Sequence, residues 1–151
     1  MVDLRRALTL LLSQPGVDRH RVAYVGHDFG AMFGLMLASV DRRPSYFVFM
    51  TPNSSLSGWY LIGKKPPEGY VARLAGFDLP AFASRLKAKS VLFQFSTHDI
   101  YVTHERAQAV FDAAPQPKTI EWIDADHSLV GDGSSYKSRM AWLEHALGVA
   151  R

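Results

Sequence analysis

The feature that most constrains this chain is a short apolar run followed at once by two closely spaced glycines. Val22–Val25 is apolar, the sequence GHDFG (residues 26–30) comes next, and the helix-like run Gly30–Val40 follows. An apolar run of this length is typical of a buried strand. Two glycines around one central polar residue indicate a sharp turn, in which a Cβ at either glycine would crowd a neighbour. The stretch therefore predicts a strand, a tight turn and a helix, with Asp28 at the turn.

Further apolar runs predict the rest of a parallel sheet. Strands are expected at Ser45–Met50, Ser90–Phe95 and Thr119–Ile123. Helices are expected at Val2–Gln14, Gly30–Val40, Leu79–Lys87, Thr103–Ala114 and Ser135–Leu147, the last with an apolar face of Tyr136, Met140, Leu143 and Leu147. Strands separated by helices pair in parallel through right-handed crossovers. We therefore expect one α/β domain over residues 1–151.

Residues 51–78, the lid segment, interrupt this alternation of strands and helices. The segment contains several prolines and glycines, interleaved with Trp59, Tyr60 and Tyr70. A connection of this length in a compact domain is usually functional or disordered. We expect a lid-like loop, in which the aromatic residues pack to form the lid. The alternative is that these residues contact the substrate.

Composition excludes several classes of function. The chain has no cysteine, which excludes disulfides and thiolate chemistry. Its net charge is +3, but the basic residues are scattered, so nucleic-acid binding is not expected. No apolar run reaches the length of a transmembrane helix, and the N-terminal stretch has Asp3 and no small-residue cleavage site. We expect a cytoplasmic protein without membrane contact, bound metal or cofactor.

Polar residues follow three of the expected strands. Asp28 follows the first, Asp99 follows the third and His127 follows the fourth. Ligands of open parallel sheets bind beyond the carboxyl ends of the strands, so we expect these side chains to meet there. A carboxylate can act as a nucleophile through a covalent ester intermediate. The chain order of candidate nucleophile, acid and histidine is the order used by one class of catalytic triad.

This order and the G-x-D-x-G turn resemble the α/β-hydrolases, in which the nucleophile lies in a G-x-S-x-G elbow. The run VLFQFSTHDIYVTHERAQAVFDAAPQPKTIEWIDADHSL resembles the dienelactone-hydrolase-like branch. The resemblance implies a three-layer α/β/α fold with a four-stranded parallel sheet, lacking the N-terminal strands of the full fold. It also implies that Asp28 is the nucleophile, Asp99 the triad acid and His127 the triad base.

The chain departs from the family pattern at two points. Its elbow aspartate resembles haloalkane dehalogenases and epoxide hydrolases, but Phe29 follows it where dehalogenases often have a tryptophan that helps hold the halide. The loop that supplies one oxyanion N–H in the family has no counterpart here, which leaves the backbone N–H of Phe29. The loss of one such donor costs about 10²–10³ in rate.

We expect hydrolysis of a small ester-like electrophile by Asp28, Asp99 and His127. Further residues expected in the lid or near the substrate are His27, Trp59, Tyr60 and Tyr70. One alternative is a catalytically weak or inactive fragment that serves as a binding or assembly module, and another is an epoxide hydrolase or haloalkane dehalogenase. Each of the three candidate catalytic residues also has a purely structural alternative. Asp28 can be a vestigial residue that caps its helix, Asp99 can cap a turn, and His127 can be a loop histidine.

The resemblance also bears on assembly. The strand Val22–Val25 lacks the neighbours that the missing half of the family fold would supply, and exposed strand edges are usually paired or covered. One face of the sheet is expected to carry only the helix Ser135–Leu147. We expect a homodimer, or a larger symmetric oligomer, joined through this edge or this face, and a small molecule as the substrate.

Overall fold

The computed structural model describes residues 1–61, 63–131 and 133–149. At its centre is a sheet of four parallel strands in the order β1-β2-β3-β4. The strands are β1 (Ala23–His27), β2 (Tyr46–Met50), β3 (Ser90–Ser96) and β4 (Lys118–Ile123). Every predicted strand is confirmed, and β1 extends further than predicted, through the first glycine of the turn.

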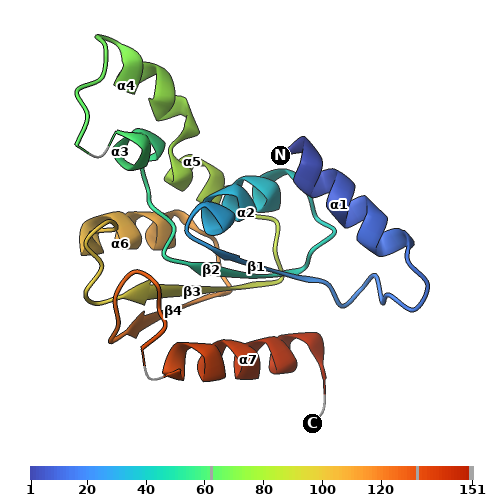
Figure 1. Ribbon diagram of the computed structural model, residues 1–151. Helices are drawn as coiled ribbons and strands as arrows, with labels where there is room; N and C mark the ends of the chain where they lie inside the picture. Colours follow the sequence, from blue (N-terminus) through green and yellow to red (C-terminus); the bar gives the residue numbers. More distant parts are fainter. Residues whose placement is uncertain (62, 132, 150–151) are drawn as a thin grey trace.

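Helices lie on both faces of the sheet and make three layers (Figure 1). One face is covered by α2 (Phe29–Val40), α5 (Leu79–Ala83) and α6 (His104–Ala113), and the opposite face by α7 (Ser134–Leu147). The helix α1 (Val2–Ser13) is tied to the end of α2 by an ion pair between Arg5 and Asp41. The predicted α/β/α architecture is therefore confirmed.

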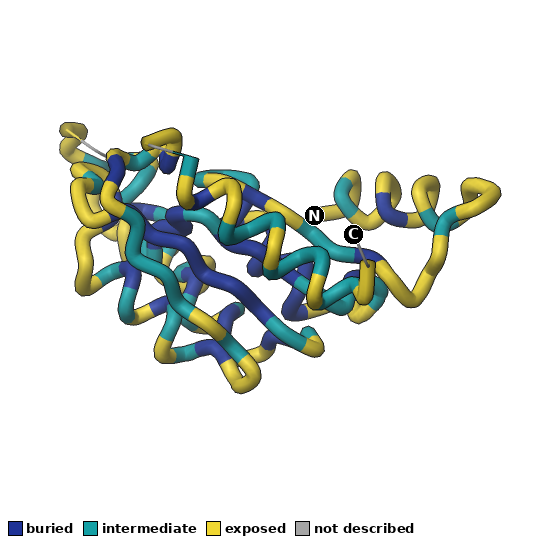
Figure 2. Tube along the Cα trace, turned by 90° about the horizontal axis from the view of Figure 1, so that it is seen from below, coloured by how far each residue is buried: buried dark blue, intermediate teal, exposed yellow. Residues whose placement is uncertain are grey.

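The core lies between the sheet and its more heavily covered face. Aromatic side chains form a continuous row across the middle strands, where the ring centroids of Phe47 and Phe49 lie 5.5 Å apart and those of Phe49 and Phe93 also 5.5 Å apart. These three side chains are fully buried, and the chain trace is most deeply buried along the same strands (Figure 2). Across the described residues, no helix combines the length and the apolar character that a membrane crossing requires.

Polar side chains attach α7 to the sheet in addition to the predicted apolar face, of which Met140, Leu143 and Leu147 are half-buried. Gln94 is fully buried in β3, and its Nε2 donates to Glu121 Oε2 (2.8 Å) and to the backbone oxygen of Ser135 (3.0 Å). Arg139 donates to Gln94 Oε1 (2.8 Å). Tyr136, predicted on the apolar face, is 58% exposed. The prediction is wrong for Tyr136 alone, and at this end of α7 the helix supplies the polar partners that the buried glutamine needs.

The lid segment folds into short helices instead of one long loop. These are α3 (Leu56–Tyr60), α4 (Tyr70–Leu74) and the 3₁₀ turn η1 (Ala75–Phe77). Two hydrogen bonds join its ends, from Leu56 N–H to Asp78 Oδ1 (3.1 Å) and from Leu79 N–H to the Ser54 oxygen (2.8 Å). The segment projects from the body of the fold, with α4 farthest from the sheet (Figure 1). The helix predicted at 79–87 is α5, which is shorter than predicted and ends at Ala83.

Candidate active site

The turn between β1 and α2 has the strained backbone that the two glycines predict. Asp28 has a φ of 54° and a ψ of −118°, and a positive φ is uncommon for a residue with a side chain. A Cβ on Gly26 would lie 2.5 Å from the carbonyl carbon of Gly30, so only glycine fits there. A Cβ on Gly30 would meet nothing within 4 Å. The predicted crowding at Gly30 is therefore wrong, because this residue already lies in α2 and faces open space.

The carboxylate of Asp28 is not used as a helix cap. Asp28 occupies the N-cap position of α2, yet its side chain makes no capping hydrogen bond to that helix, all of whose residues the structure describes. Its backbone N–H donates to the Met50 oxygen (3.0 Å), which holds the turn against β2. The side chain is 28% exposed, and its Oδ2 lies 3.8 Å from Nε2 of His127. The carboxylate is thus free to face the histidine.

The turns after β3 and β4 bring Asp99 and His127 into contact. Asp99 Oδ2 lies 2.7 Å from His127 Nδ1, and the Asp99 side chain is 2% exposed. Its other oxygen accepts the backbone N–H groups of Tyr101 (2.8 Å) and Val102 (2.9 Å). Asp99 therefore caps its own turn and also orients the imidazole. A hydrogen bond from Nδ1 to this carboxylate leaves the lone pair of Nε2 on the side of Asp28.

Of the other predicted site residues, all but Tyr70 contact His127 or the turn that carries Asp28. His27 Nε2 lies 2.9 Å from the backbone oxygen of His127 and supports its loop. Trp59 stacks on the His127 ring, with centroids 5.5 Å apart and planes 23° apart. Tyr60 contacts the Phe29 ring at 5.4 Å. Tyr70 begins α4, which projects away from the sheet, so the structure does not bring it to the site (Figure 1).

Sequence reasoning missed one residue of this cluster, Tyr101. Its ring meets the His127 ring edge to face at 5.2 Å and the Trp59 ring at 5.5 Å. Its backbone oxygen accepts from Asn53 Nδ2 (3.3 Å), which links the acid turn to the base of the lid segment. The available signal was an aromatic residue in the same turn as the acid, two positions after Asp99.

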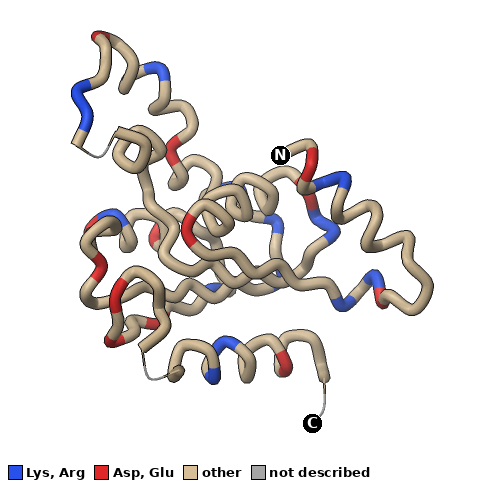
Figure 3. Tube along the Cα trace, viewed as in Figure 1, with Lys and Arg blue, Asp and Glu red and all other residues tan. Residues whose placement is uncertain are grey.

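The start of α2 offers a place at this edge of the sheet where an anion is stabilised. Phe29 is the first residue of α2, so its N–H has no acceptor within the helix and lies at the positive end of the helix dipole. Acidic residues gather in the loops beyond β3 and β4, while basic residues are spread over α1, the lid segment and α7 (Figure 3). Among the described residues, no group of three or more His, Cys, Asp or Glu side chains could hold a metal ion.

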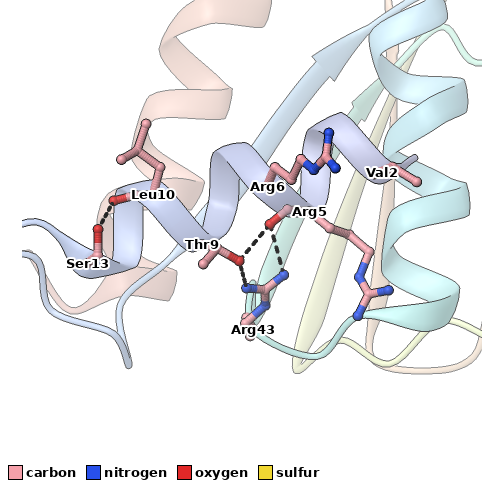
Figure 4. Close-up of a pocket in the computed structure, with 7 residues that line it drawn as sticks. All are labelled: Val2, Arg5, Arg6, Thr9, Leu10, Ser13 and Arg43. Carbon is pink, nitrogen blue, oxygen red and sulfur yellow. Dashed lines mark hydrogen bonds between the residues drawn. The ribbon is translucent and has the colours of Figure 1, made fainter.

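A groove of about 600 Å³ lies along α1, between that helix and Arg43 (Figure 4). Arg43 donates to Thr9 Oγ1 (2.7 Å), to the backbone oxygen of Arg5 (3.2 Å) and to Asp41 Oδ2 (2.6 Å). The hydrogen bonds that Asp41 accepts from Arg43, and from the Arg5 side chain, hold the pKa of this buried carboxyl far below its usual value. The groove is therefore a seam that fastens α1 to the fold, and its lining contains no member of the Asp28, Asp99 and His127 group.

No family model matches the chain, and no curated protein matches it either. Solved structures do. An acetyl xylan esterase from Paenibacillus sp. R4 is 25% identical, with a TM-score of 0.78, and the match covers 95% of this chain and 51% of that one. The α/β hydrolase GrgF from Penicillium sp. sh18 is 15% identical, with a TM-score of 0.79 and coverage of 97% and 71%.

A third similar structure is the esterase domain of a Rhodothermus marinus protein. It is 19% identical, with a TM-score of 0.74, and the match covers 96% of this chain and 67% of that one. The chain thus spans about half the length of the xylan esterase and about two thirds of the esterase domain. Its four-stranded parallel sheet, its strand-turn-helix at Asp28 and these likenesses assign the chain to the α/β-hydrolase superfamily.

Proposed function

We propose that this chain hydrolyses a small ester-like electrophile through Asp28, His127 and Asp99. The observation that carries the proposal is the continuous line of these side chains at the carboxyl ends of β1, β3 and β4. Asp99 Oδ2 lies 2.7 Å from Nδ1 of His127, and Nε2 of the same ring lies 3.8 Å from Asp28 Oδ2. An uncapped carboxylate on a strained turn, facing an oriented imidazole, has the parts that a nucleophile and its base need.

In the first step an oxygen of Asp28 attacks the acyl carbon of the substrate. The new C–O bond forms, the bond to the leaving alkoxide or phenolate breaks, and the N–H of Phe29 stabilises the developing oxyanion. This step needs no proton acceptor, because the attacking group is already a carboxylate. Because the N–H of Phe29 is the oxyanion donor that this mechanism uses, activated esters with good leaving groups are the favoured substrates.

In the second step His127 activates water. Nε2 takes a proton from water, the water oxygen bonds to the acyl carbon, and the bond to Asp28 breaks to restore the carboxylate. The proton passes to the departed leaving group or to solvent. Asp99 holds the ring and stabilises the imidazolium formed in this step, as the acid of a triad does.

The names of the similar solved structures support ester hydrolysis, since two of them are esterases. The dienelactone-hydrolase-like branch, indicated by the turns that carry Asp99 and His127, stays a prediction. An epoxide hydrolase is the second candidate, because Tyr60 contacts the elbow residue Phe29 at 5.4 Å and has a hydroxyl that can polarise an epoxide oxygen. Phe29 has no side-chain N–H for a halide, which disfavours a dehalogenase.

A non-catalytic binding or assembly module is the remaining alternative. A screen of short acyl esters, epoxides and haloalkanes, with Asp28→Asn as the control, separates these candidates. We expect turnover of activated esters and a loss of about 10⁴-fold in Asp28→Asn, as for members of interdependent catalytic sets. In His127→Ala, mass spectrometry after exposure to substrate should detect acyl-Asp28. An unmodified mass together with full activity of Asp28→Asn would rule the mechanism out.

A further inference from the structure

The nitrogen that the proposed reaction needs is covered in this structure. Nδ1 of His127 is bonded to Asp99, whereas Nε2 is buried and has no hydrogen-bond partner among the described residues. The nearest carboxylate oxygen, Oδ2 of Asp28, lies 3.8 Å from Nε2, which is beyond hydrogen-bond distance. A base that must take a proton from water is therefore closed to water in this conformation.

Three rings surround the imidazole, and they come from different parts of the chain. The His27 ring lies 5.2 Å away and the Tyr101 ring also 5.2 Å away, at 80° to the imidazole plane. Trp59 lies face to face with the imidazole, at 5.5 Å and 23°. His27 belongs to β1 and Tyr101 to the acid turn, both of which are parts of the sheet framework. Trp59 alone of the three comes from the lid segment.

The indole of Trp59 is held by aromatic contacts. It meets the Phe29 ring at 5.6 Å and 77°, and the Tyr101 ring at 5.5 Å and 74°. It thus fills a slot between the elbow and the acid turn. The two hydrogen bonds that join the ends of the lid segment, at Leu56–Asp78 and Ser54–Leu79, do not involve the indole, so the indole leaves His127 when these ring contacts part.

We propose that Trp59 is the water gate of this site, an inference that rests on the proposed function. Attack by Asp28 requires nothing of Nε2, so the acyl-aspartyl intermediate forms without a water at the histidine. Its hydrolysis requires a water whose proton passes to Nε2 while the water oxygen bonds to the acyl carbon. Trp59 therefore controls the second step and not the first, and it protects the intermediate until its indole moves away from His127.

Chemical labelling tests the cover independently of catalysis. Diethyl pyrocarbonate acylates accessible neutral imidazoles, and peptide mass mapping resolves each histidine. With an open state populated at roughly 0.1–10%, His127 should react about 10- to 1,000-fold more slowly than the exposed His20 and His145. Trp59→Ala should abolish this protection. Trp142→Ala, the same change on α7, should preserve it. Equal labelling of all three histidines in the unmodified chain, or full protection in Trp59→Ala, overturns the proposal.

Pre-steady-state kinetics with p-nitrophenyl acetate then test the step that is gated. We expect a burst of nitrophenolate followed by slow turnover, and in Trp59→Ala an unchanged burst rate with faster turnover. Equal changes in both phases would assign Trp59 to substrate binding and overturn the gate. If no substrate is hydrolysed by the unmodified chain, the proposed function fails, and the labelling result alone decides whether Trp59 covers the base.

Discussion

Nε2 of His127 lies 3.8 Å from Oδ2 of Asp28, so the two side chains face each other at a distance too long for a hydrogen bond. A carboxylate and a neutral imidazole have no proton to share across this gap. A hydroxyl at position 28 would have one, because serine donates to an imidazole lone pair. The site is therefore either one built around an aspartate nucleophile or a serine site that has lost its hydroxyl.

Asp28→Ser tests this distinction. If the site derives from a serine triad, the hydroxyl gains His127 as its base and the turnover of p-nitrophenyl acetate rises. If Asp28 is the working nucleophile, activity falls, because the acyl-aspartyl anhydride intermediate can no longer form. Stopped-flow or steady-state nitrophenolate release gives the answer, with circular dichroism to establish that the variant is folded.

Gly26→Ala and Gly30→Ala form a matched pair at the elbow. The Cβ added at position 26 would lie 2.5 Å from the backbone of Gly30, so we expect a loss of at least about 3 kcal/mol in unfolding free energy. The Cβ added at position 30 meets nothing within 4 Å, and alanine in a helix should add about 0.5–1 kcal/mol. Urea unfolding measures both, and similar losses in the two variants would contradict the geometry described for the turn.

Asp41→Asn should destabilise the chain at neutral pH. The Asp41 side chain is 4% exposed and pairs with Arg43 and, to a smaller effect, with Arg5, and both lower its pKa. A lowered pKa in the folded state stabilises the fold above the unfolded pKa, and that stabilisation is lost as pH falls through the folded value. We expect Asp41→Asn to lower the unfolding free energy by about 3 kcal/mol at pH 7.

The difference in unfolding free energy between Asp41→Asn and the unmodified chain should become smaller below about pH 4, where the Asp41 carboxyl of the unfolded chain begins to bind protons. Thermal unfolding across pH 2 to 7 measures it. Asp3→Asn is the matched control, because the Asp3 side chain is 97% exposed and its nearest partner, Arg6, is 3.9 Å away. A constant difference between Asp41→Asn and the parent at every pH would contradict the assigned ion pair.

Gln94→Leu should detach α7 from the sheet. The substitution removes the amide that bonds Glu121, Ser135 and Arg139, and burial already lowers the pKa of the Arg139 guanidinium. Leaving these groups without partners should cost about 2–4 kcal/mol. Gln108→Leu on α6, whose glutamine bonds Asp112 in an exposed position, should change stability by less than about 0.5 kcal/mol. Hydrogen exchange in α7 reports the detachment directly.

We also predict a homodimer joined through the free edge of β1. The N–H of Asp28 and the oxygen of Val22 bond β2, so the alternate residue Val25 directs its backbone groups to the outer edge. Val25 is also 43% exposed. Light scattering over a dilution series measures the oligomeric state of the chain. Val25→Pro removes the outward N–H and should weaken the dimer, while Val25→Thr retains that N–H and should preserve it. A stable monomer of the parent chain at micromolar concentration means the prediction is wrong.

The sequence by itself determined the order of the elements and the place of the site. Val22–Val25 and the three later apolar runs mark the strands, because short apolar runs bounded by turn residues favour strands that pair into a sheet. Parallel strands bring their carboxyl ends to one edge. The order along the chain was therefore enough to place Asp28, Asp99 and His127 together.

Only the tertiary structure decided how these groups are used. That Asp28 leaves its helix uncapped, that Trp59 and Tyr101 enclose the imidazole, and that α7 binds the sheet through Gln94 are contacts between segments far apart in the sequence. Local periodicity reports which face of an element is apolar, but not which partner that face meets. A buried polar group such as Gln94 overrides that periodicity, because an unpartnered amide in a core costs more than the exposure of one aromatic side chain such as Tyr136.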